Sequence, residues 1–300
     1  MPLLPAAPPQ PVPVFSGFDY VTVDAARHRV YAAHTGSARL LIVDAEGGNI
    51  VGQVRVGPLH GVAVNPADGH VFTANGTDRS VSEVDPATLK VVRSVDLEGT
   101  LDALVYDAAR SRIFVDEDDG PRLFVIDASS FKRIAAIQLP SQKLEYLAVD
   151  PETHDVYQNL DDKNAFAIVD GTTLRLKKIV ATPEIQHNHP LQYDPGLHEI
   201  VTAGNGVLSV YDRSGTKLGQ TAIPRVDQCD LDAPSHTLAC AGSQLITVYG
   251  LQAGAAPVRI AEAAVPAGCH TLAIDGKAKA IWAVWSGRDG DFVQRFNLTE

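Results

Sequence analysis

The most regular feature of the sequence is a recurring pattern of alternating apolar and polar residues. An alternating run is followed by Asp or Asn, a turn and a second alternating run, as in VTVDAARHRVYAAH from Val21 and VAVNPADGHVFTANG from Val62. Such period-2 alternation, rich in Val, Ile and Tyr, is typical of half-buried β-strands. No long window shows the competing periodicity of a helix. The Asp or Asn of each copy is its marker residue: Asp24, Asn65, Asp107, Asp150, Asp194, Asp232 and Asp275.

These seven copies recur with a period of about 40 residues, which is the range of propeller blades. Most copies continue with a third strand, such as ARLLIVDA, and a fourth, such as NIVGQVRV. The pattern therefore predicts an all-β fold, a seven-bladed β-propeller with four-stranded antiparallel blades. We expect residues 1–300 to form one domain.

The last copy has too little chain for four strands before Glu300. The N-terminal segment PVPVFSG is predicted to supply the missing outer strand, because closing the ring removes exposed sheet edges. Residues 1–13 are rich in Pro and Ala and lack the basic and apolar regions of a signal peptide, so we interpret them as a linker or a trimmed mature end.

One stretch carries a family resemblance. VYAAHTGSARLLIVDAEGGNIVGQVRVGPLHGVAVNPADGHVFTANG resembles the repeat of YVTN (YncE-like) propellers, and the similarity extends over the first four blades. The resemblance implies the propeller fold. It does not select a function, because one fold hosts many functions. Since propellers of this type are often exported by bacteria, it also implies a periplasmic or secreted location, with the cytoplasm as the alternative.

Composition narrows the partners. The net charge of −11, without any extended Lys or Arg cluster, argues against nucleic acid. No apolar stretch has the length that membrane insertion requires. Cys229, Cys240 and Cys269 form no CxxC pair, and one disulfide with one free thiol or three buried thiols are both consistent with the sequence.

Counting back five residues from each marker reaches the residue that opens the innermost strand of each blade. Acidic residues number 36 and histidines 10 among the 300, yet all seven of these positions hold one or the other. Chance does not explain such uniformity. We call these positions the ring residues: Asp19, His60, Asp102, Glu145, His189, Asp227 and His270.

The ring residues are all of types that bind metals. His60, His189 and His270 lie in blades 2, 5 and 7, roughly threefold around the axis, and three imidazoles with open positions are typical of catalytic metal sites. They are predicted to bind a divalent ion, with Zn, Mn or Fe as candidates. The carboxylates between them are the candidate catalytic groups, as ligands, orienting groups or bases: Asp19, Asp102, Glu145 and Asp227.

The main hypothesis is a metal-dependent enzyme, a hydrolase or lyase, that acts on a small molecule at the channel mouth. An oxygenase is the variant expected for iron. His34 and Glu117, in loops on the same face, are predicted to line a substrate rim. A weaker similarity to streptogramin-lyase-like propellers implies the same chemistry.

Two alternatives remain open for the ring: a metal-free polar site for an organic ligand and a water-filled channel. The alternative function is a non-enzymatic propeller that binds a ligand or a protein partner, with a structural metal or none.

Overall fold

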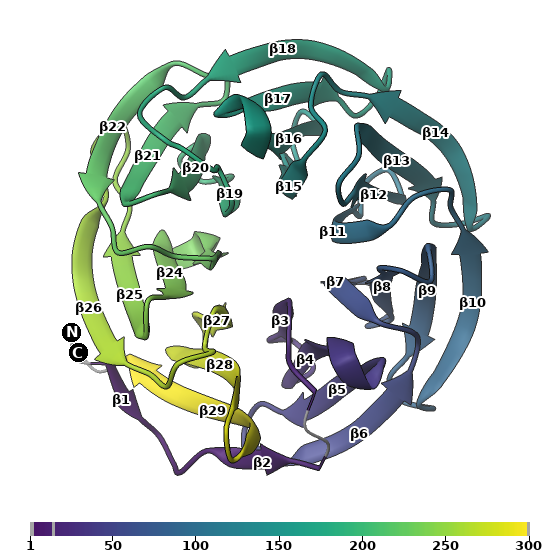
Figure 1. Ribbon diagram of the computed structural model, residues 1–300, viewed down its shortest axis with the longest axis vertical. Coiled ribbons are helices and arrows are strands. Elements are labelled where there is room, and N and C mark those ends of the chain that lie inside the picture. The colour runs from purple at the N-terminus through teal and green to yellow at the C-terminus, as the bar shows by residue number, and fades with distance from the viewer. Residues whose placement is uncertain (1–2, 14–15, 299–300) are drawn as a thin grey trace.

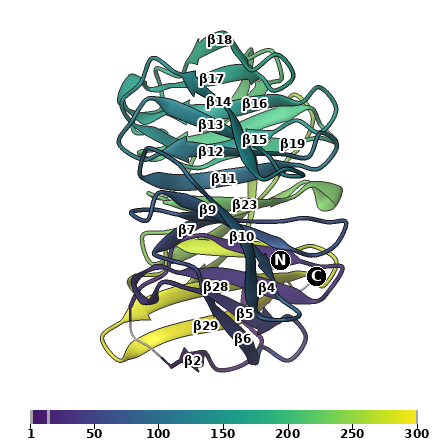
Figure 2. The ribbon, with the colours of Figure 1, turned by 90° about the vertical axis from the view of Figure 1, so that its right-hand side faces the viewer.

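The computed structural model describes residues 3–13 and 16–298 and consists of seven antiparallel sheets around a central channel (Figure 1). This confirms the predicted seven-bladed β-propeller. The innermost strands contact one another in a closed circle. The seven sheets are arranged radially around the channel and together form a disc (Figure 2). No helix in the described part of the chain is long and apolar enough to cross a membrane.

Blades 1 to 6 have four strands each, in chain order from the channel outward. Blade 1 contains β3 (Val21–Asp24), β4 (Arg29–His34), β5 (Arg39–Asp44) and β6 (Ile50–Arg55). Blade 2 contains β7 (Leu59–Val64), β8 (Val71–Asn75), β9 (Ser80–Asp85) and β10 (Lys90–Asp96). Blade 3 contains β11 (Leu101–Asp107), β12 (Arg112–Glu117), β13 (Arg122–Asp127) and β14 (Lys132–Gln138).

Blades 4 to 6 repeat this arrangement. Three 3-10 turns lie in loops of blades 1, 4 and 6. Blade 4 contains β15 (Leu144–Val149), β16 (Asp155–Leu160), β17 (Ala165–Asp170) and β18 (Arg175–Ala181). Blade 5 contains β19 (Leu191–Asp194), β20 (Glu199–Gly204), β21 (Val207–Asp212) and β22 (Lys217–Ala222). Blade 6 contains β23 (Gln228–Asp232), β24 (Thr237–Gly242), β25 (Leu245–Gly250) and β26 (Val258–Ala264). The turns are η1 (Thr35–Ser37), η2 (Asp161–Lys163) and η3 (Ala233–Ser235).

Blade 7 is closed by the N-terminal segment. Its inner strands are β27 (Thr271–Asp275), β28 (Ala280–Gly287) and β29 (Gly290–Leu298). Two short strands, β1 (Leu3–Pro5) and β2 (Gln10–Val12), pair with β29 along its outer edge. The prediction of an N-terminal closing strand is confirmed, but the strands begin earlier than PVPVFSG. The Pro/Ala-rich stretch is therefore part of the blade rather than a linker, as far as its described residues extend.

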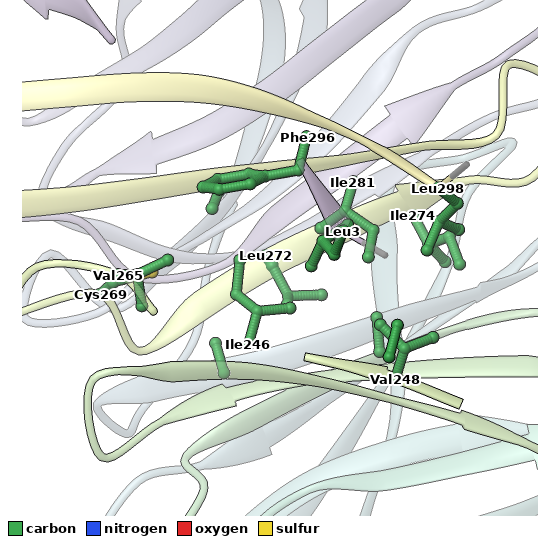
Figure 3. Close-up of a cluster of buried hydrophobic side chains, with 14 of the residues drawn as sticks. Leu3, Ile246, Val248, Val265, Cys269, Leu272, Ile274, Ile281, Phe296 and Leu298 are labelled. Carbon is green, nitrogen blue, oxygen red and sulfur yellow. The ribbon is translucent and has the colours of Figure 1, made fainter. Parts of the chain in front are cut away.

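The core consists of seven apolar clusters, one between each pair of neighbouring blades. Between blades 6 and 7, Ile246 and Val248 face Leu272 and Phe296, and Leu3 of the closing strand packs into the same cluster (Figure 3). Burying one such side chain contributes about 1.5 to 3 kcal/mol. Because each blade is needed by both its neighbours, the blades stabilise one another around the ring.

The marker residues recur because they build the turn after each innermost strand. The Asp24 carboxylate accepts hydrogen bonds from the backbone N–H groups of Ala26 and Arg27, and other markers make equivalent bonds. These are Asx turns. Some markers also join blades: Asp107 accepts from His154 Nδ1 of the next blade at 2.9 Å. The histidine of this turn, His154, is therefore structural.

The cysteines form one disulfide and leave one thiol. Cys229 and Cys240 lie opposite each other in β23 and β24 and are bonded, whereas Cys269 is free and buried. Burial raises the pKa of the Cys269 thiol to about 12. Of the two arrangements that the sequence left open, the structure has the disulfide with one unreactive thiol.

Candidate functional site

All seven ring residues line a single cavity of about 500 Å³ at one end of the channel, which we call the upper mouth. His60, Asp102 and Glu145 belong to the innermost strands β7, β11 and β15. The other four lie one or two residues before their innermost strands. Their backbones continue the sheet, as in Asp19 N–H to Ala33 O at 2.9 Å. The propeller repeat therefore brings the residues five positions before each marker into one site.

Each imidazole of the ring pairs with a carboxylate of a neighbouring blade. His60 Nδ1 lies 2.5 Å from Asp19 Oδ2, and His270 Nδ1 lies 2.7 Å from Asp227 Oδ2. His189 Nε2 lies 3.1 Å from Glu145 Oε2. Among the described residues, no cluster of potential metal-ligand atoms contains all three of these imidazoles. The structure thus does not bring the predicted three-histidine ligand set together, and each imidazole instead contacts a carboxylate of the adjacent blade.

A different trio does converge. One ligand atom each from Asp19, His60 and Asp102 lies within 4.8 Å of the other two. Gln228 Nε2 donates to Asp19 Oδ1 at 2.8 Å and fixes that carboxylate. The loop after β8 leaves room for the imidazole, since a Cβ on Gly76 would lie 2.6 Å from His60 Cδ2. We call these three residues the cation trio.

The cation trio carries more negative charge than its single imidazole can balance. Among the described residues, the Asp102 carboxylate has no basic partner except His60, which lies 3.5 Å away and is shared with Asp19. Tyr20 donates its hydroxyl to Asp102 at 3.4 Å, and Asp118 lines the same cavity. Carboxylates confined in this way either take up protons or attract a cation.

The opposite side of the upper mouth is balanced. Lys143 Nζ lies 3.0 Å from Glu145 Oε1, so Glu145 faces both an ammonium and the His189 imidazole. Asp227 faces His270 and, at 3.7 Å, His189. The excess negative charge of the ring is therefore concentrated in blades 1 to 3, around the cation trio.

The pKa values of the ring follow these contacts. Burial lowers the pKa of His60, but the Asp19 hydrogen bond and charge outweigh it and leave the pKa raised. The Asp227 hydrogen bond raises the pKa of His270, and despite burial His270 lowers the pKa of Asp227. Burial, together with the charge of Asp19, raises the pKa of Asp102 well above its usual range. The contact between Asp227 and His270 thus favours the charged form of both groups, whereas burial beside Asp19 favours the protonated form of Asp102.

Comparisons with known proteins establish the fold and leave the function open. No protein-family model matches the sequence, and a search of curated proteins gave no match. Among solved structures, a chain of "Crystal Structure of Mitotic Checkpoint Complex" is similar with a TM-score of 0.83 and 12% identity. The similarity covers 99% of this chain and 92% of that chain. As 1625 solved chains match, the likeness identifies the propeller architecture only.

Neither of the two predicted rim residues is a free group at the surface. The His34 side chain is 1% exposed and stacks on Phe18 with ring centroids 4.6 Å apart. Its Nε2 lies 2.5 Å from Asp291 Oδ2, and its Nδ1 lies 2.8 Å from Ser37 Oγ. His34 therefore joins blade 1 to blade 7 inside the protein.

Glu117 is also engaged by its own blade. Its carboxylate accepts from Arg122 Nε at 2.7 Å, and the side chain is largely buried. Sequence reasoning missed Gln228 as a member of the site and the part that Lys143 plays in it. For Gln228, the signal was its position directly after a ring residue.

Proposed function

We propose that this propeller is a binding protein whose upper mouth holds a divalent metal ion on the cation trio. The observation that carries the proposal is the convergence of Asp19, His60 and Asp102 at a point with excess negative charge. Two carboxylates and one imidazole suit Zn²⁺, Mn²⁺ or Fe²⁺, and the set contains no soft sulfur ligand. An ion there would displace the proton that His60 shares with Asp19.

The remaining space of the cavity supports a ligand beside the ion. Three ligands leave coordination positions open, and the cavity of about 500 Å³ is of the size that holds a small molecule. A ligand with an anionic group would contact the ion and meet the charged Asp227–His270 pair across the cavity. A protein partner that presents such a group would meet the same contacts.

The test measures metal binding by untagged protein and by two matched variants. Metal content by ICP-MS and Zn²⁺ and Mn²⁺ titration calorimetry are compared for wild type, Asp102→Asn and Asp227→Asn. We expect Asp102→Asn to lose at least about tenfold in affinity, because it removes a ligand charge, and Asp227→Asn to stay within a factor of about three. A wild type that binds neither ion would refute the proposal. Equal losses in both variants would place the ion elsewhere in the ring.

A second candidate is the metal-dependent hydrolase or lyase that the sequence suggested. It is favoured by the His189–Glu145 pair, which lines the same cavity as the cation trio and could accept a proton from a bound molecule. Turnover of ester or lactone substrates that disappears in Glu145→Gln while metal content stays unchanged would support an enzyme. Retained metal with no turnover in a broad substrate panel favours the binding protein.

The YVTN-like phrase supports placing the chain in that family, and the disulfide supports the proposed periplasmic or secreted location. Cross-strand disulfides such as Cys229–Cys240 persist in oxidising compartments and are rare in the cytosol. Fractionation of the native source, with mass spectrometry of the cysteine-containing peptides, tests both location and oxidation state.

A further inference from the structure

The other end of the channel holds a second cavity, of about 530 Å³, which we call the lower cavity. Tyr20 lines both cavities and so lies between them. In contrast to the upper mouth, the lower cavity has an apolar wall and few charges. The wall includes valines from each of blades 1 to 4, among them Val23, Val64, Val105 and Val149.

One carboxylate in this cavity departs from the repeat. Two residues before each marker, six of the seven blades have a neutral residue, and only blade 6 has a charged one. The propeller therefore does not need a charge at this position. A half-buried carboxylate that the repeat does not require is a candidate functional group. The seven positions are Thr22, Ala63, Val105, Ala148, Gln192, Asp230 and Ala273.

Asp230 has no cationic partner within the described part of the chain. Its Oδ2 accepts the Ile274 backbone N–H at 2.8 Å, and no Lys, Arg or His side chain forms an ion pair with it. Arg27, at the edge of the cavity, is held by Asp24 at 3.1 Å and by the carbonyl oxygens of Pro66 and Ala67. Its charge is thus already engaged.

Two polar side chains that line the cavity, Tyr146 and Gln192, already have hydrogen-bond partners. The Tyr146 hydroxyl donates to Cys229 O at 2.8 Å, and Gln192 Nε2 donates to the same oxygen at 2.7 Å. Tyr20 and Tyr146 lie with ring centroids 5.2 Å apart and bring aromatic surface to the cavity. Burial raises the pKa of Asp230 to about 6, which leaves the carboxyl mostly ionised above that pH.

We propose that the lower cavity binds an organic monocation, a protonated amine with an apolar body. The ammonium group would pair with the Asp230 carboxylate, the aromatic faces of Tyr20 and Tyr146 would add cation–π attraction, and the valines would cover the apolar part. An anion is disfavoured by Asp230. A divalent metal is disfavoured because, among the described residues, Asp230 belongs to no cluster of potential metal ligands.

The test uses n-butylammonium as the probe and n-butanol as its neutral analogue, titrated by calorimetry at a pH about two units above the Asp230 pKa. Wild type should bind butylammonium and show no measurable binding of butanol. Asp230→Asn should weaken butylammonium binding at least about tenfold, since it removes the charge. Asn can still accept the Ile274 N–H, so the variant is expected to fold. Asp289→Asn, an exposed carboxylate that lines neither cavity, should bind the probe like wild type.

Three results would overturn the proposal: no binding of butylammonium by wild type, unchanged binding in Asp230→Asn, or loss of binding in Asp289→Asn. If Asp230→Asn fails to fold, Val64→Trp replaces it, because an indole added to the wall should exclude the probe and leave Asp230 in place. Failure of either proposal leaves the other standing, because the metal titrations test Asp102 in the upper mouth and the butylammonium titrations test Asp230 in the lower cavity.

Discussion

At the scale of single residues, the same side-chain type has different roles in different blades. His60 belongs to a trio with excess negative charge, His270 to a balanced ion pair, and His34 to a buried network. The difference lies in the neighbours that the fold supplies. Asp291 illustrates this best, because its Oδ2 accepts from His34 and from the backbone N–H groups of Ser16 and Gly17.

Replacing Asp291 by Ala should destabilise the protein by about 3 kcal/mol, because three donors lose a buried acceptor. Asp289→Ala, in the same hairpin but exposed, is the control and should change stability by less than about 0.5 kcal/mol. Urea unfolding followed by tryptophan fluorescence measures both. Equal stabilities would show that the His34 network does not hold blade 7 to blade 1.

Sequence reasoning located the ring but not its contacts. The ring residues could be found from the sequence because equivalent positions of the repeat lie at the same height along the channel and at regular angles around it. Which carboxylate meets each imidazole depends on side-chain torsions, and these are set by neighbours such as Gly76 and Gln228. His34 is the last residue of strand β4, so the sequence suggested that it lies in an exposed loop. It is buried because blade 7 covers it, which the sequence does not show.

At the scale of elements, the closing strands β1 and β2 are the least conventional part of the fold. They are three residues each, yet Leu3 and Val12 are buried against blades 6, 7 and 1. The Pro residues of this segment fit an outermost strand, where a missing N–H costs little. The sequence predicted that this segment closes the ring because the last repeat has too few residues for four strands. Its Pro- and Ala-rich composition alone suggested a linker.

Removing residues 1–12 should expose the edge of β29 and the apolar cluster under Leu3. We expect a fall in melting temperature of at least about 5 °C and self-association, because unpaired sheet edges pair with other copies. Differential scanning calorimetry and light scattering after size-exclusion chromatography provide the measurements. A synthetic peptide of residues 1–13 should restore the monomer. A truncated protein that melts like wild type would contradict the closing role.

At the scale of the whole molecule, the channel gathers carboxyl groups whose pKa values are raised. Asp116 is fully buried beside Asp102, and burial raises its pKa to about 8 against the opposing hydrogen bond from Gln158. An unfolded Asp has a pKa of about 3.9. The folded state therefore binds more protons than the unfolded state between these values. The resulting stability is complete below about pH 4 and is lost as the pH rises through about 8.

We predict that the free energy of unfolding falls from about pH 5 to pH 7, by roughly 1 kcal/mol per pH unit from Asp116 alone. Asp116→Asn should flatten this dependence. Gln158 Oε1 has no partner in the described structure, so a rotated Gln158 amide could accept from the new side chain. Urea unfolding at a series of pH values tests the prediction. A wild-type stability that is constant or rises over this range would contradict it.

The pairing of β1 with β29 has a consequence for how the chain is made. The ribosome makes residues 3–12 before the six intervening blades and residues 290–298 after them, so the two halves of the closing sheet emerge far apart in time. Until β29 has emerged, the nascent propeller carries an unpaired sheet edge at each end of its growing arc. Closure of the ring therefore waits for β29, and a chain that stalls before this strand exposes its unpaired edges to chaperones and proteases.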